Sequence, residues 1–148
     1  MTTPSQENYA FMHLSLIDME RVLKSIRVIE GTTDEYLKDA LFRDAVISYV
    51  KPFSRNRGEF NEILQLQQNL VPKELQDEHE EIKGIRDKLF AHNKLTWEEL
   101  IFGPGTGFTV KGYEKVYLSR LIEPLKNLAR KVHGAIMNEM SEIKKNGL

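Results

Sequence analysis

Residues 9–29 read YAFMHLSLIDMERVLKSIRVI, and this stretch decides the fold. Its apolar side chains recur at alternating spacings of three and four residues, so they share one face of an α-helix. They are Tyr9, Met12, Leu16, Met19, Leu23 and Ile26. Upstream, Thr3 can cap the helix, Pro4 suits its first position, and Gln6 can complete a capping box. With Gly31 as a typical stop, one long amphipathic helix is predicted.

Three more segments along the chain show helical spacing. Residues 32–50 start with a second capping-box sequence and should end before Pro52, because the residue before a proline avoids helical geometry. Residues 72–90 form the next predicted helix. Residues 116–143 form the last one, and it contains Pro124, which should kink or interrupt it.

Two further regions are shorter or less regular than these helices. Residues 60–70 have the spacing of a short helix, whereas residues 96–112 predict a small hairpin or an irregular excursion. Helices joined by short connections predict an all-α protein, built as an antiparallel four-to-five-helix bundle. The length of 148 residues suits a single helical domain that covers residues 1–148.

The composition narrows the chemistry. None of the 148 residues is cysteine, which excludes a disulfide scaffold, a thiolate metal site and a cysteine nucleophile. A hydrophobic fraction of 41% with charges of both signs indicates a folded chain. No apolar run approaches the roughly 18 residues of a membrane span. The polar N-terminus resembles no leader peptide, so a cytoplasmic protein with no membrane partner is expected.

The charges are unevenly distributed. The chain has 21 basic and 22 acidic residues, and this net charge of -1 gives no overall attraction to nucleic acid. Residues 51–70 carry three basic and two acidic side chains, and residues 101–148 carry eight and four. Any contact with nucleic acid must therefore use a local patch.

Two other sequence patterns are weak evidence for a ligand site. The glycine-rich stretch 103–107 has no Lys-Ser or Lys-Thr pair behind it and follows no strand of a βαβ unit, so it is not typical of a phosphate-binding loop. Glu78, His79 and Glu81 could ligate a metal, but a charged, solvated helix face explains them better. We therefore expect no metal and no cofactor.

Residues 85–93, IRDKLFAHN, concentrate polar groups at the end of the third predicted helix. Arg86 lies on or beside the buried face of that helix, where its charge requires an acceptor. Asp87, His92 and Asn93 are close to it in sequence. This segment is therefore the strongest candidate for a functional site.

The segment RDKLFAHN, residues 86–93, resembles the signature of HEPN domains, which are all-α bundles with Arg, four to six residues, and then His. Residues 49–57, YVKPFSRNR, resemble the prokaryotic subset linked to abortive infection and toxin–antitoxin systems. Catalytic HEPN members are metal-independent endoribonucleases in which the RNA 2′-hydroxyl attacks the adjacent phosphate. The resemblance thus implies RNA as substrate, no cofactor, and a cognate antitoxin as a partner of toxin-type members.

Carried over to this chain, the motif implies catalytic roles for four residues: Arg86, His92, Asp87 and Asn93. His92 would move the proton, because imidazole titrates near neutrality. Arg86 would bind two phosphate oxygens and stabilise charge on the phosphorane, while Asp87 and Asn93 would orient these groups. The expected contacts to the RNA backbone are basic residues near the motif: Lys51, Arg55, Arg57 and Lys94.

Helix geometry adds a condition. Six residues of ideal helix turn through about 600°, which leaves Arg86 and His92 about 120° apart. Either the helix unwinds near Ala91 or the site is assembled in another way. HEPN members place the motifs of two protomers in a shared cleft, so a homodimer with both residues near its symmetry axis is expected.

Two other interpretations stay open. A non-catalytic HEPN-like domain could bind nucleic acid or protein, because many members of the family have lost activity and a fold does not fix function. In a generic helical bundle, Arg86 and Asp87 would form a structural ion pair and His92 would cap a helix end. His79 is either a core histidine or a residue that supports the site.

Overall fold

The computed structural model describes residues 2–60, 62–90, 100–102, 108–110 and 114–148. These residues form four α-helices: α1 (Pro4–Gly31), α2 (Glu35–Val50), α3 (Gln76–Phe90) and α4 (Glu114–Lys145). They also form two antiparallel hairpins, which pair β1 (Asn56–Arg57) with β2 (Ile63–Leu64), and β3 (Leu100–Phe102) with β4 (Phe108–Val110). Short 3₁₀ helices occupy η1 (Lys51–Phe53), η2 (Gln68–Leu70) and η3 (Lys73–Leu75). The predicted all-α fold and the hairpin within residues 96–112 are confirmed.

The first helix starts where its sequence predicts. The Thr3 hydroxyl accepts a hydrogen bond from the Gln6 backbone N–H at 3.2 Å, and the Gln6 side chain accepts one from the Thr3 N–H at 3.0 Å. This capping box satisfies two N–H groups that the first turn leaves unpaired. The second predicted box is wrong, because Asp34, not Thr32, caps α2 by accepting from the Leu37 N–H.

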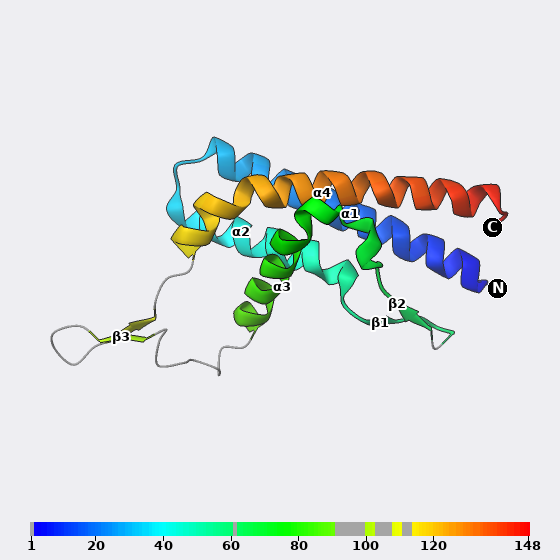
Figure 1. Ribbon diagram of the computed structural model, residues 1–148, viewed down its shortest axis with the longest axis horizontal. Coiled ribbons are helices and arrows are strands. Elements are labelled where there is room, and N and C mark those ends of the chain that lie inside the picture. Colours follow the sequence, from blue (N-terminus) through cyan, green and yellow to red (C-terminus); the bar gives the residue numbers. More distant parts are fainter. Residues whose placement is uncertain (1, 61, 91–99, 103–107, 111–113) are drawn as a thin grey trace.

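The two longest helices, α1 and α4, run antiparallel and side by side (Figure 1). At one end the Lys144 ammonium lies 5.6 Å from the centre of the Tyr9 ring, and near the other end Lys126 pairs with Glu30 at 2.9 Å. The helix α2 folds back along α1, and α3 packs against both α2 and α4. This arrangement is the antiparallel bundle that the apolar spacing predicts.

The core lies between the facing sides of all four helices. It holds fully buried side chains at helical spacing, which are Met19, Val22, Ile26, Phe42, Val46, Tyr49, Ile82, Leu125, Leu128, Val132 and Ile136. α4 continues through Pro124, so the expected interruption is not found. The buried neighbours Leu121 and Leu125 hold this part of α4 in the bundle, so packing outweighs the hydrogen bond that proline cannot donate.

The short helix predicted for residues 60–70 is wrong. This segment contains the turn of the β1–β2 hairpin, the strand β2 and the 3₁₀ helix η2. Its apolar spacing does not mark a buried face, because Phe60 is 41% and Ile63 is 53% exposed. Leu66 is the buried side chain, and its N–H donates to the Pro52 carbonyl at 2.8 Å, which ties the segment to η1.

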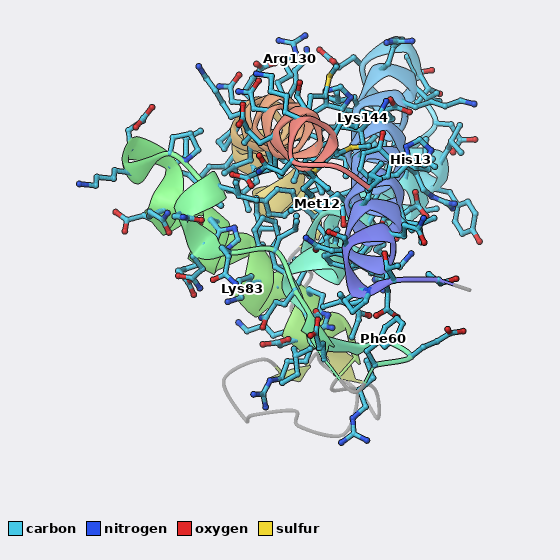
Figure 2. The ribbon with its side chains drawn as sticks, turned by 90° about the vertical axis from the view of Figure 1, so that its right-hand side faces the viewer. Met12, His13, Phe60, Lys83, Arg130 and Lys144 are labelled. Carbon is cyan, nitrogen blue, oxygen red and sulfur yellow. The ribbon has the colours of Figure 1, made fainter. Side chains whose placement is uncertain are left out.

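The β1–β2 hairpin is attached to α1 through one carboxylate. Glu7 of α1 accepts a hydrogen bond from the backbone N–H of Glu59 in the hairpin turn. Gly58 precedes this N–H, and a Cβ atom at Gly58 would lie 2.5–2.6 Å from the Glu7 carboxylate. Figure 2 shows the neighbouring Phe60 beside the start of α1. Glycine is therefore required at position 58 for this contact.

Gly58→Ala is expected to lower the free energy of unfolding by about 1 kcal/mol, because the methyl group displaces the Glu7 carboxylate from its donor. Chemical denaturation of a double-mutant cycle with Glu7→Ala measures this. In the Glu7→Ala background the same substitution should be neutral or slightly stabilising, since alanine restricts the unfolded chain more than glycine. Equal destabilisation in both backgrounds would show that Glu7 is not the cause.

Candidate functional site

The side chain of Arg86 is held between α3 and the chain that follows η1. It is 31% exposed, and its Nη2 donates to the Ser54 hydroxyl at 3.1 Å. Its Nη1 donates to the Asp87 carboxylate at 2.9 Å. The Ser54 hydroxyl donates in turn to the Val50 carbonyl at 3.3 Å, at the end of α2. The acceptor that the sequence requires for Arg86 is therefore present, and it fixes the guanidinium at the edge of the bundle.

Ser54 connects Arg86 to a basic stretch of chain. Arg55 and Arg57 follow it at the start of the β1–β2 hairpin, and both side chains are exposed. Within the described residues, neither of these two side chains makes a hydrogen bond or an ion pair. Lys51 differs, because its ammonium lies 3.3 Å from the Asp18 carboxylate of α1. Two of the predicted RNA contacts are thus available to an anion, while Lys51 is already paired.

The second half of the motif follows the described part of α3. This described part extends to Phe90. His92, Asn93 and Lys94 lie outside the described residues, so the roles predicted for them stay predictions. Arg86 and Asp87 are therefore the members of the predicted catalytic set whose geometry is defined, and they lie in contact.

His79 is a core residue of the seam between α2 and α3. It is fully buried, and its Nδ1 lies 2.8 Å from the hydroxyl of Tyr49. Its ring meets the Phe53 ring edge to face, with 4.7 Å between the centres. Two turns before Arg86, His79 joins α3 to the end of α2 and to η1, so it helps to fix the helix that carries Arg86.

The protonation of this buried pair follows from its surroundings. Burial lowers the pKa of His79, although the nearby Glu80 raises it in part. Burial also raises the pKa of Tyr49, so its phenol stays protonated, and it shares with Nδ1 one hydrogen bond whose direction is set by the imidazole tautomer. The other ring nitrogen, Nε2, is buried and has no hydrogen-bond partner among the described residues. His79 therefore folds in its uncharged form.

Stability is expected to fall as the pH drops below about 6.5, the ordinary pKa of histidine. The folded-state pKa of His79 is lower than this, so the unfolded chain takes up the proton first and is favoured. One such group contributes up to about 1.4 kcal/mol per pH unit. Urea denaturation near pH 7.5 and near pH 5.5 measures the change, and His79→Leu should reduce it. An unchanged pH dependence in His79→Leu would contradict this assignment.

Sequence reasoning did not find two residues of this region, Ser54 and Tyr49. Each makes its contact with a residue about 30 positions away in the chain, and neither shows a local pattern that predicts it. The sequence also did not predict the role of Asp18 as the partner of Lys51, since a single acidic residue on a helix predicts no particular partner. Only the folding of α2 and η1 against α1 and α3 brings these groups together.

The described residues give no support to a metal site or a membrane span. Among them, no three histidine or acidic side chains gather closely enough to hold a metal ion. Glu81 binds Arg120 of α4, and His79 is turned into the core, so the metal pattern considered at residues 78–81 is not assembled. No described helix has both the length and the apolar character needed to cross a membrane.

Comparisons of the chain with protein-family models, with curated proteins and with solved structures found no match. Assignment of the site therefore rests on the residues and contacts described above.

Proposed function

We propose that the protein is a metal-independent endoribonuclease of the HEPN type, with Arg86 and His92 in its active site. In this reaction the RNA 2′-oxygen bonds to the adjacent phosphorus while the bond to the 5′-oxygen breaks. The proton leaves the 2′-hydroxyl and another is delivered to the departing 5′-oxygen. The products are a 2′,3′-cyclic phosphate and a 5′-hydroxyl end.

The observation that carries this proposal is the position of Arg86. Its guanidinium is partly exposed, is fixed by Ser54, and lies six residues before His92. A guanidinium held in this way can donate two parallel hydrogen bonds to a phosphate and stabilise the charge of the transition state. Arg55 and Arg57 supply exposed positive charge on the adjoining hairpin, as RNA backbone contacts require.

The remaining roles follow from the chemistry of the side chains. His92 serves as the general base and then the general acid, because imidazole exchanges protons near neutral pH. Asp87 already accepts a hydrogen bond from Arg86 and orients the guanidinium. Asn93 orients the substrate beside His92, and Lys94 contacts the RNA backbone.

The active site is proposed to lie at the interface of a homodimer. A single straight helix would separate Arg86 and His92 by about 120°, whereas two copies of the motif can complete one site across a symmetry axis. Sedimentation velocity at assay concentrations tests this part of the proposal. A protein that is a monomer under conditions where it cleaves RNA would exclude the shared site.

One observation favours the alternative, a non-catalytic domain of the same type that binds nucleic acid or protein. Arg86 already pairs with Asp87 at 2.9 Å, and its bond to Ser54 connects α3 to the chain that follows η1, which is a structural role that needs no RNA. A carboxylate at this place also competes with a phosphate for the guanidinium. The two functions differ in whether RNA is cut, not only in whether it is bound.

Incubation of purified protein with total RNA and a defined oligonucleotide, in the presence of EDTA, tests the proposal. We expect cleavage, with fragments that end in a 2′,3′-cyclic phosphate and a 5′-hydroxyl. Growth arrest on expression in bacteria would support a toxin or phage-defence role. RNA binding without any cleavage would favour the alternative and overturn the enzyme.

A further inference from the structure

A cavity of about 280 Å³ lies between the N-terminal half of α1, the start of η1 and the β1–β2 hairpin. Five residues give it apolar walls, which are Ala10, Phe11, Leu14, Pro52 and Leu64. It is separate from the proposed active site, since Arg86 does not line it. Cavities of this kind, with apolar walls and few polar groups, are typical sites for small ligands.

Two carboxylates of α1, Glu7 and Asp18, line this cavity. They are eleven residues apart, so they lie on the same helix face, about 16 Å apart along the axis. We refer to this cavity, whose lining residues extend along α1 from Glu7 to Asp18, as the slot. The slot therefore has apolar walls and a negative charge near each end.

Each carboxylate is held away from bulk water. One oxygen of Glu7 accepts the Glu59 N–H, and the other is buried without a hydrogen-bond partner among the described residues. The side chain of Asp18 is only 14% exposed, and burial raises its pKa although Lys51 opposes this. The Glu7 oxygen without a partner favours a ligand that brings a donor to it, whereas Asp18 already accepts a hydrogen bond from an ammonium.

Of the described residues that line the slot, Lys51 is the only one with a positively charged side chain. Its side chain is 62% exposed, and its ammonium lies 3.3 Å from Asp18. Because the Lys51 side chain is exposed and flexible, its ammonium can turn into solvent when another ammonium binds Asp18. The pair thus shows that Asp18 binds an ammonium group, and a ligand ammonium can replace that of Lys51.

We propose that this slot binds a linear diammonium ligand of the polyamine class, with one ammonium at Asp18, the other at Glu7, and the methylene chain along the apolar walls. Allowing about 2.8 Å for each hydrogen bond leaves about 11 Å between the two nitrogens. An extended chain of about eight methylenes spans this distance, whereas a four-methylene diamine reaches only one carboxylate at a time.

Isothermal titration calorimetry at low ionic strength, with four probes, tests the proposal. The probes are 1,8-diaminooctane, octylamine, 1,4-diaminobutane and spermidine. The eight-carbon diamine should bind about tenfold more tightly than octylamine, because it makes a second charge-assisted hydrogen bond. Spermidine has a similar length and should bind more tightly than 1,4-diaminobutane. Equal affinity for 1,8-diaminooctane and octylamine, or no binding of either at millimolar concentration, would overturn the proposal.

Substitutions make the test specific. Asp18→Asn and Glu7→Gln should each weaken 1,8-diaminooctane binding about tenfold, to the level of octylamine. Lys51→Ala should tighten binding several-fold, because it removes the internal competitor at Asp18. Asp39→Asn is the matched control, since Asp39 is also a paired carboxylate but lies on α2 with Arg43. An unchanged affinity in Asp18→Asn, or weaker binding in Lys51→Ala, would contradict the assigned pose.

Ala10→Phe blocks the slot without changing its charge. Ala10 is an exposed helical position that lines the slot, so a larger side chain can fill it while α1 stays folded. Binding of 1,8-diaminooctane should be lost, whereas Ala40→Phe, at an exposed position of α2, should leave it unchanged. Circular dichroism confirms folding in both variants. Retained binding in folded Ala10→Phe would place the ligand elsewhere.

Discussion

Arg86→Ala and His92→Ala are each expected to lower the rate of RNA cleavage by about 100-fold or more. Without His92 no side chain of the motif transfers the proton near neutral pH. Without Arg86 the charge that develops on the phosphate loses a donor held by Ser54 at 3.1 Å. Cleavage of a labelled oligonucleotide in EDTA under single-turnover conditions measures both effects.

Arg86→Lys separates charge from geometry at this position. Lysine keeps the positive charge but cannot donate two parallel hydrogen bonds from a planar group, so we expect nearly the same loss as with alanine. Arg130→Ala is the matched control, because Arg130 is an exposed arginine of α4 on the side of the bundle away from the β1–β2 hairpin (Figure 2). Its cleavage rate should equal that of the wild type.

Two outcomes would contradict the assigned roles. If folded Arg86→Ala and His92→Ala both cleave RNA at the wild-type rate, the activity does not come from this motif. If RNA binding falls in Arg86→Ala while the wild type cuts nothing, the protein is a binding domain. Circular dichroism and thermal midpoints must match the wild type for either result to bear on catalysis, since Arg86 also holds α3 to Ser54.

Local signals in the sequence predicted the helices well. The Thr3 capping box and the stop at Gly31 both depend on residues within a few positions of each other. Apolar spacing placed Met19 and Ile26 in the core for the same reason. Signals of this kind are decided by the helix itself and not by its neighbours.

Where tertiary contacts decide the structure, the sequence failed or gave no prediction. Residues 60–70 have helical spacing, but the bond from Leu66 to Pro52 and the contact of Glu7 with the turn hold them in a hairpin instead. Pro124 predicts an interruption of α4, yet burial of the adjacent turns keeps the helix continuous. Propensity is a weak guide when burial on both sides opposes it.

In the candidate site, too, the sequence predicts the local contacts but not the contacts between distant segments. The need of Arg86 for an acceptor follows from its place in the apolar spacing, and the adjacent Asp87 meets it in part. The other acceptor, Ser54, is 32 residues away and carries no signal in the sequence. The slot between Glu7 and Asp18 is similar, because its walls come from α1, η1 and the unpredicted hairpin.

Tyr49→Phe is expected to lower the free energy of unfolding by about 1–3 kcal/mol, the second-largest effect that the structure predicts. The substitution keeps the ring but removes the hydroxyl, which leaves the Nδ1 of His79 buried without its partner at 2.8 Å. Tyr36→Phe is the matched control, since Tyr36 is 84% exposed and should change stability little. Equilibrium urea denaturation at neutral pH measures both.

Adding His79→Leu distinguishes a buried polar pair from simple packing. His79→Leu alone leaves the Tyr49 hydroxyl without its partner and should also destabilise the fold. In the double variant both polar groups are gone, so its destabilisation should be smaller than the sum of the single effects by about 1 kcal/mol or more. Additive effects would mean that the two side chains contribute independently.

The contact between α2 and α3 also positions Arg86, through Ser54 and the Val50 carbonyl. A Tyr49→Phe variant in which this contact is weakened should therefore cleave RNA more slowly, and the double variant should recover part of the cleavage rate.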